Sequence, residues 1–291
     1  MLYDSVPDTL SQLIRTAFIP SPGNCFIVAD YSAIEARVIA WLASEKSTLE
    51  AFRDGKDLYC ETVSRMFKVP VEKHGVHGEL RQKGKIAVLA CGYGGSVGAL
   101  KAMGALRMRL VEDELKPIVD AWRAVNPHIV WLWQEVEDAA LKAITTRTPV
   151  RLRNLAFTLE SGILFITLPS GRRLAYVKPG LGQNRFGGTS ITYWGINTGR
   201  KWGRLETYCG KLTENIVQAI ARDLLVNGMK NVAEAGHQIV MHVHDEIVID
   251  EPLDSSFTVK DACQLMSRLP GWAKGLPLTA DGYECAYYRK D

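Results

Sequence analysis

The stretch at residues 239–250, I-V-M-H-V-H-D-E-I-V-I-D, constrains the fold of this chain more than any other. Two apolar β-forming triplets, I-V-M and I-V-I, flank His244, Asp245 and Glu246, so the pattern predicts two short strands with the acids at a tight bend. Adjacent carboxylates in an apolar setting are costly unless a cation or hydrogen bonds neutralise them. By itself the stretch indicates either a metal site or an ordinary hairpin with acids at a solvated turn.

A second acidic strand end lies at residues 25–37, C-F-I-V-A-D-Y-S-A-I-E-A-R. Its apolar run predicts a buried strand that ends at Asp30, and Ser32-x-x-Glu35 predicts a capping box that opens an amphipathic helix ending at Ala43. An acid at a strand end beside a helix N-terminus is well placed to hold a cation against phosphates. A turn aspartate and a helix-capping glutamate are the alternatives, but the two acidic stretches together favour one shared Mg²⁺ site.

A basic segment at residues 81–94, R-Q-K-G-K-I-A-V-L-A-C-G-Y-G, separates the two acidic stretches. It predicts a helix at residues 79–91, which the glycines at residues 92–98 then break, and residues four positions apart share one broad face of such a helix. That face carries Arg81, Lys85, Leu89 and Tyr93. Two cations there predict a clamp for a triphosphate, although a solvated basic helix face fits the same pattern.

Periodicity elsewhere predicts further elements. The helices expected are residues 48–54, 57–67 with Asp57 as N-cap, 111–125, 128–145, 208–235 and 258–268, and a closing strand is expected at 278–289. Residues 180–203 are rich in glycine and basic residues, and we expect a loop-rich binding surface there, with the interleaved aromatic residues Phe186, Tyr193, Trp194 and Trp202.

Positive charge is concentrated in the middle of the chain, although the net charge is only +3. Residues 142–211 contain twelve Lys or Arg against Glu160 and Glu206, which predicts that this region binds a polyanion. The six cysteines form no Cys-x-x-Cys pair and predict free thiols in a reducing cytosol. With no signal peptide and no apolar run of roughly 18 residues, we expect a soluble, cytoplasmic monomer that binds no membrane.

The three motifs together resemble those of family A DNA polymerases, the bacterial and phage DNA polymerase I group. D-Y-S-A-I-E-A-R at residues 30–37 resembles the first palm motif, V-H-D-E at residues 243–246 resembles the last, and residues 81–94 resemble the motif between them. The order and spacing of the motifs are specific, and the resemblance extends over nearly all of the chain. It implies an α+β fold with an antiparallel palm sheet backed by helices and a mainly helical fingers subdomain.

The resemblance also implies an arrangement of subdomains. We expect residues 1–45 to form the first part of the palm, 46–207 the fingers and a basic connecting region, and 208–291 the second part of the palm. Only 29 residues precede Asp30. We therefore expect a fragment of a longer polymerase that lacks the thumb and exonuclease domains, or a reduced relative.

The activity implied by the resemblance is DNA-templated DNA synthesis for replication, in which a deoxynucleoside triphosphate reacts with a primer 3′-hydroxyl by a two-metal-ion mechanism with Mg²⁺. Asp30, Asp245 and the backbone carbonyl of Tyr31 match the metal ligands. Glu246 matches a further catalytic residue close to the metals. The partners implied are a DNA primer-template and deoxynucleoside triphosphates.

The resemblance assigns binding roles to several other residues. The nucleotide-binding residues implied are Arg81, Lys85, Leu89, Tyr93 and Glu35, and the DNA-binding residues are Gln218, His244 and Lys211. Glu35 matches the residue that blocks a ribose 2′-hydroxyl. Leu89 stands where the family usually has an aromatic residue. The resemblance implies that this difference affects discrimination at the sugar 3′ position. The family's Arg and Asn before Gln218 fall at Gly210 and Glu214, so we expect Lys211 or Asn215 to substitute.

Two other functions remain open on the sequence alone. One is a nucleotide- or DNA-binding module with little catalysis of its own. The other is a metal-dependent hydrolase, because His242-x-His244-x-Glu246 places three zinc-ligand types on one face of an extended strand.

Overall fold

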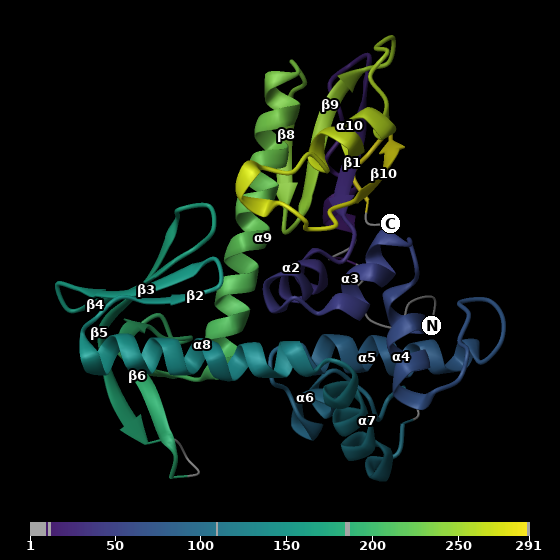
Figure 1. Ribbon diagram of the computed structural model, residues 1–291. Helices are drawn as coiled ribbons and strands as arrows, with labels where there is room; N and C mark the ends of the chain where they lie inside the picture. The colour runs from purple at the N-terminus through teal and green to yellow at the C-terminus, as the bar shows by residue number, and fades with distance from the viewer. Residues whose placement is uncertain (1–9, 11–12, 109, 184–186, 290–291) are drawn as a thin grey trace. The chain divides into compact units, whose positions relative to one another are not determined.

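The computed structural model describes residues 10, 13–108, 110–183 and 187–289 (Figure 1). The chain divides into two compact units. The first unit comprises Met1–Ile34, Ala221–Lys274 and Leu278–Asp291, and the second comprises Glu35–Ile220 and Gly275–Pro277. Both contain antiparallel sheets and helices, so the expected α+β class is confirmed.

A four-stranded antiparallel sheet forms the centre of the first unit, in the order β10-β1-β9-β8. Its strands are β1 (Asn24–Tyr31), β8 (Ile239–Val243), β9 (Glu246–Pro252) and β10 (Ala280–Cys285). The unbroken apolar run of β1 reflects burial on both faces of the strand: helices cover one face, and Phe26 and Val28 pack with the buried Tyr288 on the other. Accordingly, Ile27, Val28 and Ala29 are each 1% exposed or less.

Helices cover one face of this sheet. They are the part of α9 (Cys209–Glu234) that belongs to the first unit and α10 (Val259–Met266), and η2 (Gly271–Ala273) follows α10. The hydroxyl of Tyr31 donates to the carbonyls of Leu224 in α9 and Met266 in α10, at 3.1 and 2.8 Å. A Cβ on Gly228 would lie 2.7 Å from that hydroxyl, so α9 can approach β1 only with glycine there.

The helices of the second unit are α2 (Ile34–Ala43, of which Ile34 falls in the first unit), α3 (Lys46–Arg53), α4 (Leu58–Phe67), η1 (Gly78–Leu80), α5 (Arg81–Cys91), α6 (Val97–Ala102), α7 (Glu112–Val125) and α8 (Pro127–Thr146). Asp57 caps α4 by accepting from the N–H groups of Tyr59 and Cys60, as predicted. The rings of Trp122 and Trp133 stack at 6.1 Å and join α7 to α8.

The capping box expected at Ser32 and Glu35 is wrong. Helix α2 begins at Ile34, and Ala33, which precedes it, has a φ of 51°. The Ser32 hydroxyl instead donates to Asp281 on β10. A short polar side chain near a helix start found a partner from another part of the sheet, which sequence spacing cannot reveal.

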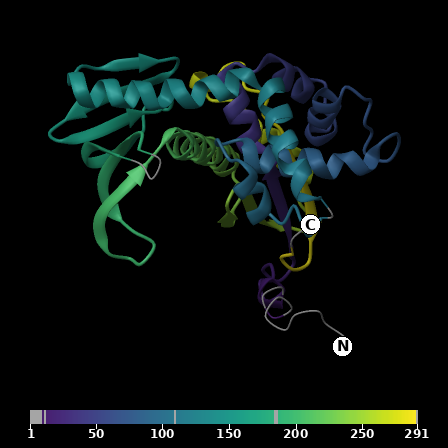
Figure 2. The same cartoon turned by 90° about the horizontal axis from the view of Figure 1, so that it is seen from below.

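The second unit also contains a six-stranded antiparallel sheet whose strands follow one another in chain order. The strands are β2 (Val150–Leu152), β3 (Leu155–Glu160), β4 (Ile163–Thr167), β5 (Arg173–Gln183), β6 (Thr189–Ile196) and β7 (Trp202–Thr207). Helix α8 contacts β2, β3 and β4. Figure 2 shows β5, β6 and β7 extending away from the part that α8 covers.

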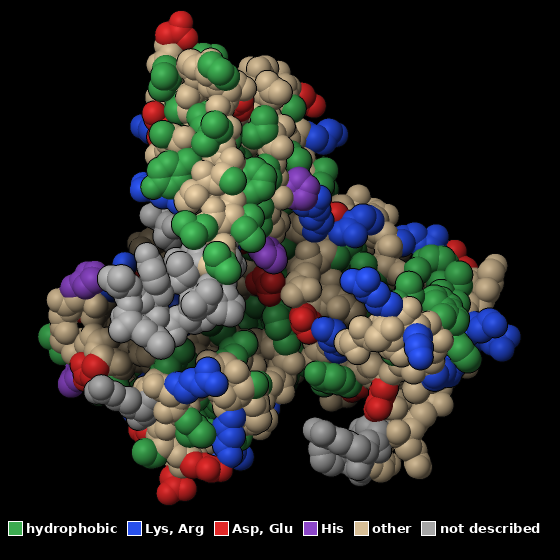
Figure 3. Space-filling model, turned by 180° about the vertical axis from the view of Figure 1, so that it is seen from behind, with side chains coloured by type: hydrophobic (Ala, Val, Ile, Leu, Met, Phe, Trp, Pro, Cys, Tyr) green, Lys and Arg blue, Asp and Glu red, His purple; other side chains and the backbone are tan. Residues whose placement is uncertain are grey.

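The loop-rich surface expected at residues 180–203 is therefore wrong, because most of this stretch forms β5 and β6. Its glycines make room for neighbouring strands: a Cβ on Gly180 would lie 2.4 Å from Arg204 Nη2, and one on Gly182 would lie 2.9 Å from Thr192 Cγ2. Phe186 lies outside the described residues. Lys and Arg side chains gather over β2–β7 on the face seen in Figure 3.

All six cysteines are free, as expected. In the part of the chain that the structure describes, no helix has the length and apolar character that crossing a membrane requires.

Candidate active site

Asp30 and Glu246 lie directly opposite each other on β1 and β9. The antiparallel register pairs their Cα positions, and paired residues project from the same face of a sheet. Asp245 lies in the two-residue turn before Glu246, and its backbone carbonyl accepts a 3.3 Å hydrogen bond from the Tyr31 N–H. The fold of the first unit thus brings together the acids of the two acidic stretches.

The electrostatics of this cluster favour a bound cation. The pKa of Asp30 is raised to about 7, first because its carboxyl group is partly removed from water and then because Asp245 and Glu246 repel its ionised form. A hydrogen bond with the Asp245 side chain adds to this effect. Crowded carboxylate oxygens are the donors that a hard divalent cation takes. The donor set of Asp30, Asp245 and the Tyr31 carbonyl therefore fits the expected metal.

Sequence patterns did not indicate two further residues at this end of the sheet. The buried Tyr288 donates a 2.5 Å hydrogen bond from its hydroxyl to Glu246 Oε1, and burial together with that carboxylate raises the pKa of Tyr288. Asp281 lies opposite Asp30 in the register of β1 and β10. The sequence could have indicated Asp281, because it is an acid within the predicted closing strand. Nothing in the sequence links Tyr288 to Glu246.

The zinc site considered for His242, His244 and Glu246 is wrong. His244 lies in the turn between β8 and β9 with a φ of 54°, so the three residues do not share one strand face. His242 contacts the Arg222 guanidinium at 3.2 Å. Among the described residues, no group of three or more His, Cys, Asp or Glu is arranged to hold a metal ion. A metal at Asp30 and Asp245 would rely on two carboxylates and backbone or other oxygen ligands.

In the second unit, α5 carries Arg81, Lys85 and Leu89 on one face. Lys85 and Leu89 are exposed. Arg81 donates from Nε and Nη2 to Asp57 Oδ2, at 3.0 and 2.8 Å. Partial burial acts to raise the pKa of Asp57, but hydrogen bonds from Arg81 and the Cys60 N–H outweigh it and hold that pKa below its usual value. These bonds use Nε and Nη2 of Arg81, so a phosphate would bind at Nη1 or displace Asp57.

Tyr93 lies two residues beyond the end of this helix. The helix ends at Cys91, and Gly94 has a φ of +76°. A Cβ on Gly95 would lie 1.9 Å from the carbonyl oxygen of Ala90. Gly94 and Gly95 thus permit a sharp change of direction directly after Tyr93.

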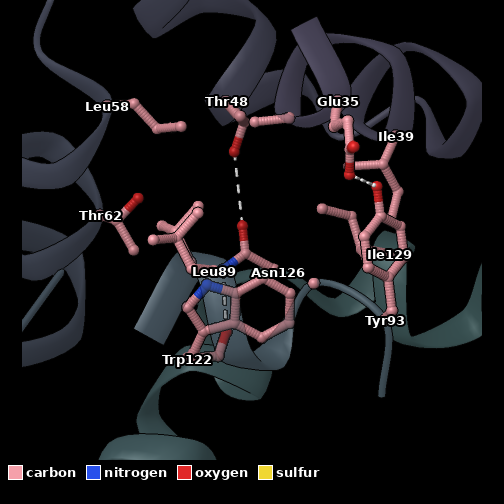
Figure 4. A pocket seen from close by; sticks show the side chains of 13 residues that line it. Glu35, Ile39, Thr48, Leu58, Thr62, Leu89, Tyr93, Trp122, Asn126 and Ile129 are labelled. Carbon is pink, nitrogen blue, oxygen red and sulfur yellow. Dashed lines mark hydrogen bonds between the residues drawn. The ribbon is translucent and has the colours of Figure 1, made fainter. Parts of the chain in front are cut away.

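Three predicted nucleotide-binding residues line one pocket of the second unit (Figure 4). They are Glu35, Leu89 and Tyr93. The Tyr93 hydroxyl donates a 2.5 Å hydrogen bond to Glu35 Oε2. Much of the remaining wall is apolar and includes Leu58, Trp122 and Ile129. Arg81 and Lys85 are not among the lining residues.

The start of α9 holds the predicted DNA-binding residues Gln218 and Lys211. Gln218 Nε2 lies 3.5 Å from Glu35 Oε1, and Lys211 Nζ lies 3.0 Å from Glu214 Oε2. A Cβ on Gly210 would lie 2.1 Å from the Tyr93 carbonyl oxygen, which explains why no larger residue stands there. Asn215, the other expected substitute, donates to the Tyr176 hydroxyl at 3.0 Å. His244 is exposed in the β8–β9 turn.

Comparison with known proteins decides the family. A model of "DNA polymerase family A" matches residues 5–162, more than half of the chain. The chain belongs to this family. The expected family is thereby confirmed: the match includes the motifs at residues 30–37 and 81–94, and the motif at residues 243–246 lies beyond it.

Individual relatives agree with this membership. A DNA polymerase of Bacillus phage SP02 is 55% identical over 293 residues, which cover 100% of this chain and 45% of the phage protein. The thermostable DNA polymerase I of Thermus thermophilus is 26% identical over 250 residues, which cover 84% of this chain and 25% of that protein. The chain thus spans less than half the length of either relative.

A solved structure shares the fold. It is the POL domain of Pol1 from M. smegmatis in complex with DNA primer-template and dNTP, and the match has a TM-score of 0.63 and 20% identity. The match covers 95% of this chain and 42% of that chain.

Proposed function

We propose that this chain is the catalytic region of a DNA-templated DNA polymerase, which transfers a nucleotide from a deoxynucleoside triphosphate to a primer 3′-hydroxyl. The observation that carries the proposal is the convergence of Asp30 with Asp245 and Glu246 at one end of the first unit's sheet. These acids lie in stretches that resemble motifs of family A DNA polymerases, the family to which the chain belongs.

The metal expected is Mg²⁺, held as two ions by Asp30, Asp245 and the Tyr31 carbonyl. The bound ions would make the primer hydroxyl more acidic and neutralise the charge of the departing pyrophosphate. The raised pKa of Asp30 supports this assignment, because partial burial and the carboxylates of Asp245 and Glu246 disfavour its ionised form, and a bound cation would favour that form. Glu246, anchored by Tyr288, is placed to orient groups beside the metals without ligating them.

Residues of the second unit have roles toward the substrates. Lys85 binds the triphosphate through charge, and Arg81 joins it at Nη1 or by exchanging Asp57 for a phosphate. Glu35, held by Tyr93, excludes a ribose 2′-hydroxyl. The residues proposed to contact the primer-template are Gln218, His244 and Lys211.

Primer extension with Mg²⁺ tests this function. The assay uses the chain alone and the chain joined to the part of the phage SP02 polymerase that lies outside their similarity. We expect extension by at least the joined form, abolished by Asp245→Asn. Asp254→Asn is the matched control, because Asp254 is an exposed acid of the same unit and should not matter.

Circular dichroism should show that Asp245→Asn keeps the fold. Extension that survives Asp245→Asn would contradict the proposed metal site. Binding of nucleotides without extension by either form would instead favour a nucleotide-binding module.

A further inference from the structure

The turn between β6 and β7 is flanked by two matching dipeptides. Trp194-Gly195 lies near the end of β6, and Trp202-Gly203 opens β7. The register pairs Gly195 with Gly203. This hairpin follows residue 162, where the match to the family model ends. It contains none of the three motifs described above.

Both tryptophans lie on the same face of the hairpin. Ile196 pairs with Trp202, and Trp194 pairs with Arg204 two positions along, so all four side chains project to one side. Trp202 is 58% exposed, Ile196 is 68% exposed and Trp194 is 36% exposed. Two indole rings and an isoleucine so close together make an exposed apolar patch, which commonly marks an interaction site.

Positive charge borders this patch. Arg200 and Lys201 are exposed in the turn between the strands. Arg204 donates from Nε and Nη2 to Thr192 Oγ1 at 3.0 and 2.6 Å, and from Nη1 to the Lys178 carbonyl at 3.1 Å. These bonds hold its guanidinium on the same face as the tryptophans. In the sequence between Arg173 and Thr207, Glu206 is the only acid.

We propose that this hairpin tip, formed by Trp194, Ile196, Arg200, Lys201 and Trp202, binds single-stranded nucleic acid. Exposed aromatic rings stack on unpaired bases of any sequence, and neighbouring cations hold the phosphates. A duplex keeps its base faces covered, so it uses the cations and not the rings. A second copy of the chain fits the patch poorly, because a symmetric contact would bring the same cations together.

The inference goes beyond the proposed function and does not depend on it. The tip contains none of the residues assigned to metal or nucleotide. Its test therefore uses EDTA and no nucleotide, and reads binding alone. The binding expected here is the same whether or not Asp245→Asn abolishes primer extension.

The experiment measures fluorescence anisotropy of labelled oligo(dT), oligo(rU) and a duplex of equal length with the full chain. We expect single strands to bind, and Trp194→Ala and Trp202→Ala each to weaken oligo(dT) binding about tenfold. Trp131→Ala on α8 is the matched control, because Trp131 is 57% exposed and lies outside the patch. It should bind as the unchanged chain does.

Charge is tested by Arg200→Glu combined with Lys201→Glu. This variant should bind weakly and show a shallower dependence of affinity on salt, since fewer counterions are released. If this variant loses affinity for oligo(dT) and oligo(rU) by the same factor, the two cations recognise DNA and RNA single strands alike. If the factors differ, the cations favour the strand whose affinity falls more.

Several results would overturn the proposal. The first is that the unchanged chain does not bind single strands. The second is that both tryptophan variants bind as well as the unchanged chain. The third is that Trp131→Ala loses as much affinity as the tryptophan variants of the patch. A dimer in light scattering that disappears in Trp202→Ala would assign the patch to self-association instead. Circular dichroism of each variant separates loss of the patch from loss of the fold.

Discussion

The hydroxyl of Tyr93 donates a 2.5 Å hydrogen bond to the carboxylate of Glu35, which joins the segment that follows α5 to the start of α2. Burial raises the pKa of Tyr93 well above its usual range, and the Glu35 charge raises it further. The tyrosine therefore stays neutral and remains a donor. A second donor, Gln218 Nε2, lies 3.5 Å from the other oxygen of the same carboxylate, Glu35 Oε1.

Tyr93→Phe should lower the stability of the chain. It removes the hydroxyl and leaves a partly buried carboxylate without its short hydrogen bond. Hydrogen bonds to charged groups contribute about 1.5–3 kcal/mol, so we expect a loss of that order in the free energy of unfolding measured with urea. Tyr208→Phe is the control, because Tyr208 is 55% exposed in the same unit. Equal effects of the two changes would contradict the role of the bond.

Asp30→Asn should stabilise the chain in EDTA at neutral and alkaline pH. The pKa of Asp30 is about 7 in the folded chain against an ordinary value of 3.8. Between these values the folded state holds a proton that the unfolded state releases, so this residue makes stability fall as pH rises from about 4 to about 7.

Thermal unfolding across that pH window measures the effect. The Asp30→Asn variant should have the flatter profile, with its advantage over the unchanged chain largest above pH 7. Added Mg²⁺ should stabilise the unchanged chain and not the variant, since ligands stabilise the state that binds them. If the stability of the two chains changed with pH in parallel, the result would contradict the raised pKa of Asp30.

Lys85→Ala should weaken binding of all four deoxynucleoside triphosphates by a similar factor. A lysine cation recognises phosphate charge and carries no information about the base. Loss of one charge-assisted bond corresponds to about a tenfold rise in Kd, which titration calorimetry can measure. Lys142→Ala, at an exposed lysine of α8, should have no effect. A defect limited to one base would refute this role.

Gly210→Ala and Gly98→Ala should have opposite effects on stability. A Cβ at Gly210 would lie 2.1 Å from the Tyr93 carbonyl oxygen, so we expect a loss of about 1–3 kcal/mol. A Cβ at Gly98 in α6 meets nothing within 4 Å, so alanine there should add about 0.5–1 kcal/mol. Urea unfolding compares the two. The same sign for both changes would show that helix propensity, and not the Tyr93 contact, decides the outcome.

The local elements of this protein could be predicted from its sequence. The apolar run of β1, the β8–β9 hairpin and the helix α5 follow from hydrophobic periodicity, and the Asp57 cap follows from its place before α4. Each depends on residues that are neighbours in the chain. The order of the three motifs was likewise enough to indicate the family.

Other features depend on contacts between residues far apart in the sequence. Ser32 has the spacing of a helix cap, yet it donates to Asp281. Arg81 has the spacing of a phosphate ligand, yet it pairs with Asp57. Residues 180–203 have the composition of a loop, yet their glycines leave room for side chains such as Arg204 and allow strands to form.

The acidic cluster shows the division most clearly. The sequence by itself determined that Asp30 ends an apolar strand and that Asp245 and Glu246 follow another. Only the tertiary structure placed Glu246 opposite Asp30 and Tyr288 against Glu246. Burial of the apolar residues of β1 and β9 stabilises that strand pairing enough to hold like charges together, and sequence patterns contain no measure of such a distance.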